Sequence, residues 1–340
     1  MSIVSKTQKT EDKAWQKILS NAITDPKELC DLLELAPDIF DLLSHHDSKI
    51  SNFDLKVPRN LLSRMVKGDV DDPILKQLLP VQAELLLNKM YTKDPVGDVD
   101  AIAGSGMIHK YHGRLLIVMT GACAVHCRYC FRRHFNYLES SFSIKQMHQI
   151  TRYLQQHNDI DEVILSGGDP LSVSDQKLQS MVQLLESEPQ IKKLRIHTRL
   201  PIIIPERMTR FLVNLFSSTR LKVIIVFHIN HANEIDDSVS VMLNKLSEAR
   251  LVLLNQSVLL KGVNNNPDAL VALSEKLFEN NIYPYYLHAM DKVEGAIHFD
   301  LEEEEIREVY HQISMRLSGY LLPKLVREIS NKPYKVPFFS

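Results

Sequence analysis

Two kinds of hydrophobic pattern follow one another along the chain. Up to about residue 92, apolar residues recur at three- and four-residue spacing, in stretches 14–23, 25–35, 58–68 and 72–90. This is the period of an α-helix, and Pro or Asp-Pro opens several of the stretches. The pattern predicts an N-terminal helical portion. Residues 92–114 are rich in Gly, Asp and Pro, which predicts a linker.

From residue 114 the pattern changes to six short apolar runs: "RLLIVMT", "DEVILSG", "LRIHTR", "KVIIVFHIN", "RLVLLNQS" and "IYPYYLHAM". Runs rich in β-branched and aromatic residues are typical of buried parallel strands. Segments of helical period lie between them, at 143–157, 174–187, 205–217, 238–249 and 266–280. Alternating strands and helices pair in parallel through right-handed crossovers, so the chain is predicted to form a doubly wound sheet or a complete or partial barrel.

Polar residues follow the end of every predicted strand. They are the cysteine-containing stretch 123–135, residues 166–170, His197 and Arg199, His228 to His231, residues 255–257, and His288 with Asp291. The carboxyl ends of parallel strands converge on one face of the sheet. We therefore expect a single functional site that receives side chains from all six strands.

Composition narrows the class of protein. The chain has 340 residues, 44% of them hydrophobic, and a net charge of −2, as in ordinary globular proteins. This balance gives no overall field that would attract nucleic acid or an anionic membrane.

No apolar leader and no run of about 18 apolar residues occurs, so we expect a cytoplasmic protein without membrane contact. Three of the four cysteines are clustered, which favours metal or redox chemistry over a disulfide framework.

The cysteine cluster lies in "CAVHCRYCFRRHF", residues 123–135, with the spacing C-x3-C-x2-C. Three thiolates so close in sequence can bind one metal centre. A [4Fe-4S] cluster held by three cysteines leaves one iron open to a small molecule. A structural zinc would need a fourth ligand, which His126 or His134 could supply. Unligated thiols are a third interpretation.

"CAVHCRYC" resembles the cysteine signature of radical S-adenosylmethionine (SAM) enzymes, and "SGGDPL" resembles their glycine-rich element. The resemblance implies a partial (β/α)6 barrel over residues 109–299, after an N-terminal helical portion and linker at 1–108. A C-terminal helix and closing tail would occupy 300–340. It also implies that Cys123, Cys127 and Cys130 each bind one iron and that SAM chelates the fourth. The glycine-rich residues Ser166, Gly167, Gly168 and Asp169 are implied to bind SAM, and Gln256 is implied to bind a cofactor.

The likeness extends from about residue 50 to the C-terminus. "KYHGRLLIVMTGACAVHCRYCFRRHF", "LRIHTRLP", "NQSVLLKGVN", "PYYLHAMDKVEGAIHF" and "SGYLLPKLVREISNKPYKVP" together resemble the lysine 2,3-aminomutase family, in particular its elongation factor P β-lysine-forming branch. This family also uses pyridoxal phosphate, bound covalently by a lysine that corresponds to Lys335. The resemblance further implies that Tyr111 and Arg114 contact that cofactor. Without it, Lys335 is an ordinary tail lysine and "LVREI" is an exposed helical face.

For the substrate, the resemblance implies that Arg132 binds a carboxylate and that Asp291 and Glu328 face a side-chain ammonium. Two carboxylates favour a cationic side chain over an anionic one. The implied reaction converts L-lysine to β-lysine, with the R form expected, and draws on a reducing electron donor. The product would modify elongation factor P through its β-lysine ligase.

Two features depart from the free-lysine enzymes of the family. Those enzymes have aspartate at the position of Glu328, which puts the fit for free lysine in question. They also continue past the pyridoxal lysine into a segment linked to zinc and oligomer assembly, whereas this sequence stops at residue 340. We therefore expect no zinc and a smaller assembly, with a homodimer as one candidate.

Two other functions remain as alternatives. One is a mutase that makes a free β-amino acid unconnected with translation. The other is an RNA- or translation-factor-binding protein that uses Arg128, Arg132 and Arg133 as a basic patch around a structural zinc. The near-zero net charge and the lack of a repeated aromatic-basic pattern argue against this second alternative, and no direct contact with nucleic acid is expected.

Overall fold

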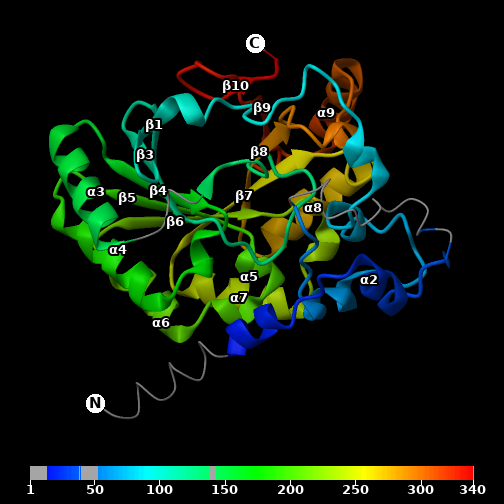
Figure 1. The fold of residues 1–340 in the computed structure, drawn as a ribbon, viewed down its shortest axis with the longest axis horizontal. Coiled ribbons are helices and arrows are strands. Elements are labelled where there is room, and N and C mark those ends of the chain that lie inside the picture. The colour runs from blue at the N-terminus through cyan, green and yellow to red at the C-terminus, as the bar shows by residue number, and fades with distance from the viewer. Residues whose placement is uncertain (1–13, 38, 40–52, 138–142, 340) are drawn as a thin grey trace.

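The protein is described by a computed structural model that covers residues 14–37, 39, 53–137 and 143–339 (Figure 1). Its centre is one sheet whose strands lie in chain order from β1 to β10. The strands are β1 Ile102–Gly104, β2 Met107–Tyr111, β3 Arg114–Thr120, β4 Glu162–Gly167, β5 Lys193–Thr198, β6 Lys222–His228, β7 Val252–Leu259, β8 Tyr283–Ala289, β9 Lys324–Arg327 and β10 Val336–Pro337. Strands β3 to β9 are parallel, whereas β1, β2 and β10 pair antiparallel at the two ends. Because β1 and β10 end the order without pairing to each other, the sheet forms an open, partial barrel.

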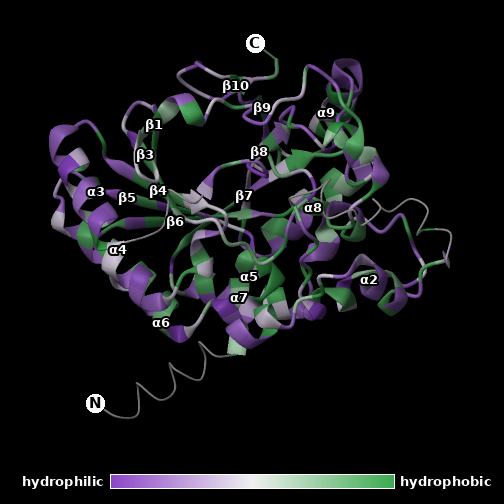
Figure 2. Ribbon diagram, viewed as in Figure 1, coloured by the Kyte–Doolittle hydropathy of each residue, from purple (hydrophilic) through white to green (hydrophobic). Residues whose placement is uncertain are grey.

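Helices cover the outer face of the sheet, between the strands they connect (Figure 1). They are α3 Ile144–Gln156, α4 Asp175–Ser187, α5 Leu200–Ile203, α6 Arg210–Ser218, α7 Asp237–Glu248, α8 Pro267–Glu279 and α9 Glu303–Arg316. Side-chain caps fix several starts: Ser143 accepts a hydrogen bond from the Gln146 amide, and Asn266, before Pro267, accepts one from the Ala269 amide. Every residue of β4 is buried, and the strands and inner helix faces are predominantly hydrophobic (Figure 2).

All six predicted strands are present as β3 to β8, and the five predicted helical segments contain α3, α4, α6, α7 and α8. The prediction of a partial α/β barrel is therefore confirmed. The linker prediction for residues 92–114 is incomplete, because β1 and β2 form there and extend the sheet. Hydrogen bonding to β3 outweighs the local preference of Gly and Asp for turns.

The N-terminal prediction is only partly right. Residues 14–20 and α2, Pro26–Leu32, are helical. In contrast, the stretches 58–68 and 72–90 contain only short 3-10 turns, at Arg59–Arg64, Leu75–Gln77 and Gln82–Leu85. Several of their apolar residues, including Leu61, Leu75 and Leu78, are buried against the barrel, whereas others, such as Leu87, are exposed. The apolar residues that pack against the barrel are spaced as in an α-helix, although these segments do not form one.

The helical interpretation of "LVREI" is wrong, because Leu325 to Arg327 belong to β9, a seventh parallel strand that pairs with β8. Two of its residues, Leu325 and Val326, are buried. Strand β10 then pairs back onto β9 and carries the C-terminal tail along the barrel edge. The sheet thus continues across the domain boundaries predicted near residues 108 and 300. These boundaries remain predictions.

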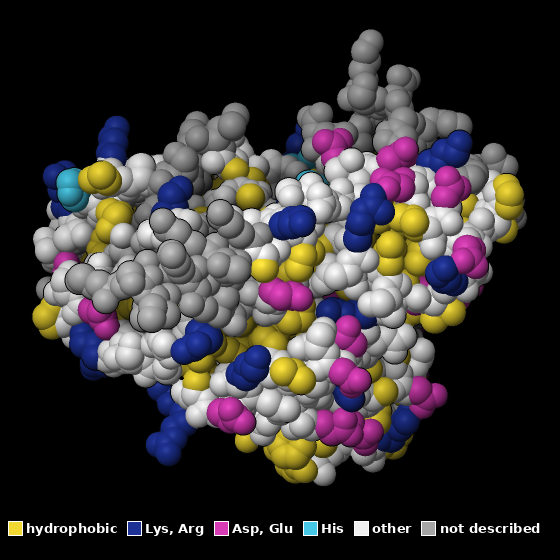
Figure 3. All heavy atoms as spheres, turned by 90° about the horizontal axis from the view of Figure 1, so that it is seen from below, with side chains coloured by type: hydrophobic (Ala, Val, Ile, Leu, Met, Phe, Trp, Pro, Cys, Tyr) yellow, Lys and Arg dark blue, Asp and Glu magenta, His cyan; other side chains and the backbone are white. Residues whose placement is uncertain are grey.

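The surface in Figure 3 shows Lys, Arg, Asp and Glu side chains intermixed, without a broad region of one sign. Within the part of the chain that the structure describes, no helix has the length and apolar character required to cross a bilayer.

Candidate functional site

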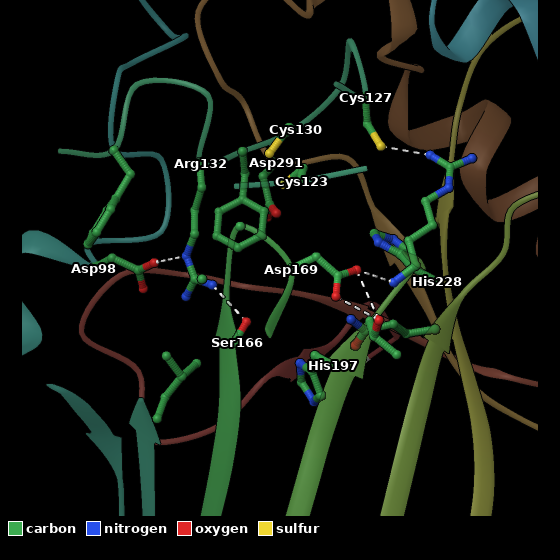
Figure 4. Close-up of a pocket in the computed structure, with 18 of the residues that line it drawn as sticks. Asp98, Cys123, Cys127, Cys130, Arg132, Ser166, Asp169, His197, His228 and Asp291 are labelled. Carbon is green, nitrogen blue, oxygen red and sulfur yellow. Dashed lines mark hydrogen bonds and ion pairs between the residues drawn. The ribbon is translucent and has the colours of Figure 1, made fainter. Parts of the chain in front are cut away.

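A cavity of about 680 Å³ opens among the carboxyl ends of the parallel strands (Figure 4). It brings together every site residue that the sequence predicted. These are Tyr111, Arg114, Cys123, Cys127, Cys130, Arg132, Ser166, Gly167, Gly168, Asp169, Gln256, Asp291, Glu328 and Lys335. Lys335 in particular is no longer an ordinary tail lysine, since its side chain is 22% exposed and lines the cavity. Their position in the cavity is observed, whereas the roles assigned to them are proposals.

The cysteines lie in the loop that leaves β3, at the wall of the cavity. Burial raises the pKa of Cys123 above its usual range and that of Cys130 to about 11. The Cys127 sulfur accepts a hydrogen bond from Nη1 of Arg199 at 2.7 Å, and Lys56 Nζ donates to the Cys123 carbonyl at 2.8 Å. Three thiols on one wall suit a cluster in which each sulfur binds a different iron.

A single zinc ion would need these sulfurs to converge on one point. Across the described residues, no three His, Cys, Asp or Glu side chains are arranged to hold one metal ion. The two histidines proposed as a fourth ligand are engaged elsewhere: His126 Nδ1 lies 2.7 Å from the Asp54 carbonyl, and His134 Nε2 lies 3.1 Å from that of Glu294. The donor set therefore fits a cluster better than a mononuclear site.

The glycine-rich turn after β4 is pressed against the cysteine loop. A Cβ on Gly167, whose φ is +122°, would lie 2.6 Å from the Thr120 carbonyl. A Cβ on Gly168 would lie 2.6 Å from the Ala122 carbonyl, and the Gly168 amide donates to the Thr120 carbonyl at 2.7 Å. The sequence suggested that these glycines admit a ligand. The structure adds a second reason, which is that only glycine lets the two backbones touch.

Asp169 connects this turn to the end of β5. Its carboxylate accepts hydrogen bonds from the Thr198 hydroxyl at 2.8 Å, the Arg199 amide at 2.7 Å and the Leu200 amide at 2.8 Å. Burial raises the pKa of Asp169, although these hydrogen bonds act in the opposite direction. With its oxygens committed to protein groups, Asp169 shapes the cavity wall through the backbone.

A chain of ion pairs crosses the opposite side of the cavity. Arg132 donates from Nε to Asp98 Oδ2 at 2.7 Å and from Nη1 to the Ser166 hydroxyl at 3.0 Å (Figure 4). Lys110 Nζ lies 2.7 Å from Asp98 Oδ1 and 3.1 Å from Glu328 Oε1.

Asp98 and Lys110 were missed by sequence reasoning. Lys110 had one available signal, its place next to Tyr111 in "HKYHGR", and Asp98 in "GDVD" had none of that kind. Because both charges are largely buried, each is stabilised mainly by its partners in this chain of ion pairs.

The two acidic residues assigned to a substrate ammonium differ in environment. Burial alone would raise the pKa of Glu328, but the Lys335 and Lys110 ammonium groups lower it to about 2. Glu328 also forms an ion pair with Lys335 through Oε2. In contrast, burial raises the pKa of Asp291 to about 7. Its Oδ1 has no hydrogen-bond partner among the described residues.

The residues assigned to pyridoxal phosphate meet where β2 turns into β3. Tyr111 pairs with Arg114 across the turn, and the Arg114 guanidinium lies 5.0 Å from the centre of the Tyr111 ring. Burial and the nearby Glu328 raise the pKa of Tyr111. A phenol and a guanidinium at the cavity edge suit an aromatic ring that carries a phosphate.

Three histidines of the cavity wall, His197, His228 and His288, have their pKa lowered by burial, that of His228 to about 4. They are therefore neutral at pH 7. Sequence reasoning placed them at strand ends without giving them a role.

The basic patch proposed for nucleic-acid binding is not a surface feature. Arg128 and Arg133 share one carboxylate: Arg128 Nη2 lies 2.5 Å and Arg133 Nη2 2.7 Å from Glu84 Oε2, and all three side chains are at most 5% exposed. Arg132 is buried against Asp98. Arginines buried in this way do not form a surface patch that could bind the phosphates of a nucleic acid, so this alternative is disfavoured.

Comparison with known proteins agrees with the fold. Residues 117–267 match the family model of the radical SAM superfamily. Over 323 residues the chain is 43% identical to the L-lysine 2,3-aminomutase of Escherichia coli K12, covering 95% of this chain and 94% of that protein. The enzyme of the same name from Haemophilus influenzae is 44% identical, with 96% and 95% covered.

A third relative, the L-lysine 2,3-aminomutase of Methanococcus maripaludis, is 31% identical and is covered over 75% of its length. The fold and the site thus define a radical SAM protein. More narrowly, the chain belongs to the L-lysine 2,3-aminomutase family.

Proposed function

We propose that this protein is an L-lysine 2,3-aminomutase, which moves the α-amino group of lysine to the neighbouring carbon. The observation that carries the proposal is one cavity that is lined by three cysteines, Arg132, two acidic residues and Lys335. The 43% identity to an enzyme of that name over nearly the whole chain supports it.

Three groups would occupy the cavity. Cys123, Cys127 and Cys130 would hold a [4Fe-4S] cluster, with SAM on its open iron beside the turn 166–169. Lys335, Tyr111 and Arg114 would hold pyridoxal phosphate. When bound, the cluster and SAM supply a hydrogen-abstracting radical, and pyridoxal phosphate supplies a covalent carrier for the amino group. Gln256, within β7, would contact a cofactor.

The chain's own residues bind and orient the substrate. Arg132, fixed by Asp98 and Ser166, presents its remaining N–H groups to the α-carboxylate of lysine. A carboxylate of the same cavity, Asp291 or Glu328, pairs with the side-chain ammonium. Charged contacts at the two ends of the substrate fix the position of the carbons between them, which is the main contribution that a protein makes to a reaction of this kind.

The barrel wall also excludes water. The histidines of β5, β6 and β8 are neutral and buried, so they add no positive charge to the wall around the reacting carbons.

The direct test is incubation of anaerobically reconstituted, reduced protein with SAM, pyridoxal phosphate and L-lysine, L-glutamate or L-ornithine in separate reactions. Chiral chromatography should detect β-lysine, with the R form expected, and little product from glutamate. Rearrangement of glutamate alone, or of no amino acid, would refute the proposal. Omission of pyridoxal phosphate should abolish turnover and leave the iron-sulfur absorbance unchanged.

The resemblance of the motifs to the elongation factor P branch supports a role in β-lysylation of that factor. We propose that the product passes to a β-lysine ligase in the reducing cytoplasm, that a small electron carrier reduces the cluster, and that the protein acts as a homodimer. Elongation factor P incubated with the ligase and this enzyme should gain the mass of one lysyl group only when the enzyme is active. An unchanged mass would restrict the protein to making a free β-amino acid.

A further inference from the structure

Lys56 belongs to the N-terminal segment of the chain, yet its side chain lies against the cysteine loop. Its Nζ donates a hydrogen bond to the Cys123 carbonyl at 2.8 Å. The backbone around it is fixed, because Leu55 and Val57 are buried and Val57 exchanges two backbone hydrogen bonds with Ile23, at 2.8 and 3.0 Å. The ammonium group is therefore held beside the first cysteine by the packing of its own neighbours.

This ammonium group has no carboxylate partner. Lys56 is partly buried, and none of the ion pairs between described residues includes it. A cation that is removed from water without a counterion costs free energy, and it is stabilised by an anion bound nearby.

The four arginines in or against the cysteine loop all have a carboxylate partner: Arg128 and Arg133 share Glu84, Arg132 pairs with Asp98, and Arg199 pairs with Glu234. Within the described ranges, Lys56 is therefore the one cation in contact with this loop that no carboxylate of the protein neutralises. It also lies outside residues 117–267, which match the radical SAM family model.

We propose that Lys56 is the fixed counterion of the iron-sulfur cluster and that its positive charge raises the reduction potential of the cluster. The inference rests on the proposed function, which assigns Cys123, Cys127 and Cys130 to a [4Fe-4S] cluster. In the step concerned, the cluster gains one electron from the reduced electron carrier, which loses one electron. No bond and no proton changes at Lys56.

The charge of Lys56 matters because a cluster held by three thiolates is an anion, and reduction makes it more negative. The carbonyl oxygen and the sulfur of one cysteine are only a few bonds apart, so the ammonium lies no more than about 8 Å from the Cys123 sulfur. A cation at this distance in a partly buried site stabilises the more negative state. The hydrogen bond goes to the carbonyl and not to the sulfur, so iron bound by the sulfur leaves it in place.

The experiment is a redox titration of the reconstituted protein without SAM or lysine, followed by electron paramagnetic resonance of the reduced cluster. Lys56→Met removes the charge and keeps an apolar stem, so the equilibrium constant for reduction should fall about tenfold, a shift of about 59 mV to more negative potential for one electron. Lys56→Arg keeps the charge and should stay within about threefold of the unaltered protein. Lys67→Met is the matched control, because Lys67 is an exposed lysine of the same N-terminal segment that pairs with Glu34, and it should leave the potential unchanged.

Iron and inorganic sulfide are measured for every variant, so that loss of the cluster is not mistaken for a change in potential. If Lys56→Met holds too little cluster for the titration, Lys56→Gln takes its place. Loss of the cluster from both neutral variants with retention in Lys56→Arg would also support the need for the charge.

An unchanged potential in a fully loaded Lys56→Met protein would overturn the inference. An equal shift in Lys56→Arg, or loss of the cluster from that variant too, would do the same, because the fit of the side chain and not its charge would then be decisive. If the unaltered protein takes up no iron and sulfide, the cluster assignment and with it the proposed function fail, which is a different result from a loaded cluster that is insensitive to Lys56.

Discussion

Nε of Arg132 donates to Oδ2 of Asp98 at 2.7 Å, and both side chains are at most 8% exposed. A second contact, from Arg132 Nη1 to Ser166, holds the other side of the guanidinium. Together they fix the plane of the guanidinium before any substrate enters. The guanidinium, which we propose binds the substrate carboxylate, is therefore preorganised by residues from three separate segments, namely the loop before β1, the cysteine loop and β4.

Substitution of Asp98 should weaken substrate binding without removing any group that contacts substrate. In Asp98→Asn the charge that holds Arg132 and Lys110 is lost, so we expect KM for L-lysine to rise about tenfold, with a smaller change in kcat. Steady-state kinetics under anaerobic conditions measure both. Asp100→Asn, an exposed neighbour, is the control and should behave as the unaltered enzyme. An unchanged KM in Asp98→Asn would show that Arg132 does not depend on this carboxylate.

Replacement of one cavity cysteine should remove the cluster. In Cys127→Ser we expect iron and inorganic sulfide to fall to a small fraction of the reconstituted level, because a hydroxyl is a poor ligand for iron-sulfur clusters. Cys30→Ala is the control, since Cys30 is buried in α2 away from the cavity, and it should keep a full complement of both. Loss of iron and sulfide from Cys30→Ala alone would contradict the assignment.

The contact between the glycine turn and the cysteine loop can be tested with a single methyl group. In Gly168→Ala the new Cβ would lie 2.6 Å from the Ala122 carbonyl, so the backbone of one segment must move. We expect a loss of about 2 kcal/mol in the free energy of unfolding and poorer cluster retention. Gly319→Ala has no atom within 4 Å of the new Cβ and should change neither. A fully stable Gly168→Ala protein with normal iron content would refute the tight contact.

Asp291 should destabilise the free protein as the pH rises. Its pKa is about 7 when folded and 3.8 in the reference state, so the folded chain binds more protons between these values and stability falls as pH rises from 4 to 7. Asp291→Asn should therefore stabilise the protein more at pH 8 than at pH 5, by about 2 to 3 kcal/mol in urea unfolding. A benefit that is equal at both pH values would show that Asp291 is not protonated by burial.

Sequence pattern predicted the central part of the fold because strands β3 to β8 carry apolar runs, and β4 is buried along its whole length. It failed where partners distant in sequence decide the structure. Leu61 and Leu75 keep helical spacing, yet they are buried by the barrel and lie in 3-10 turns. Strand β9 is short and partly charged, so its pairing with β8 leaves no clear periodic signal.

The same limit applies to the site. Motif residues such as Cys123 and Lys335 could be named from the sequence because their spacing or their resemblance to a family identified them. Asp98 and Lys110 could not, since their importance comes from ion pairs with Arg132 and Glu328, which lie 34 and 218 residues away. No local pattern encodes such a pairing.

The central claim is migration of nitrogen between adjacent carbons of lysine, and isotopic labelling tests it most directly. L-lysine labelled with ¹⁵N at the α-amino group should be incubated with the reduced, reconstituted enzyme, and the product examined by ¹⁵N and ¹³C NMR. The account predicts β-lysine in which the label is bonded to C3. Label that remains on C2 of unchanged lysine, or β-lysine without the label, would contradict it.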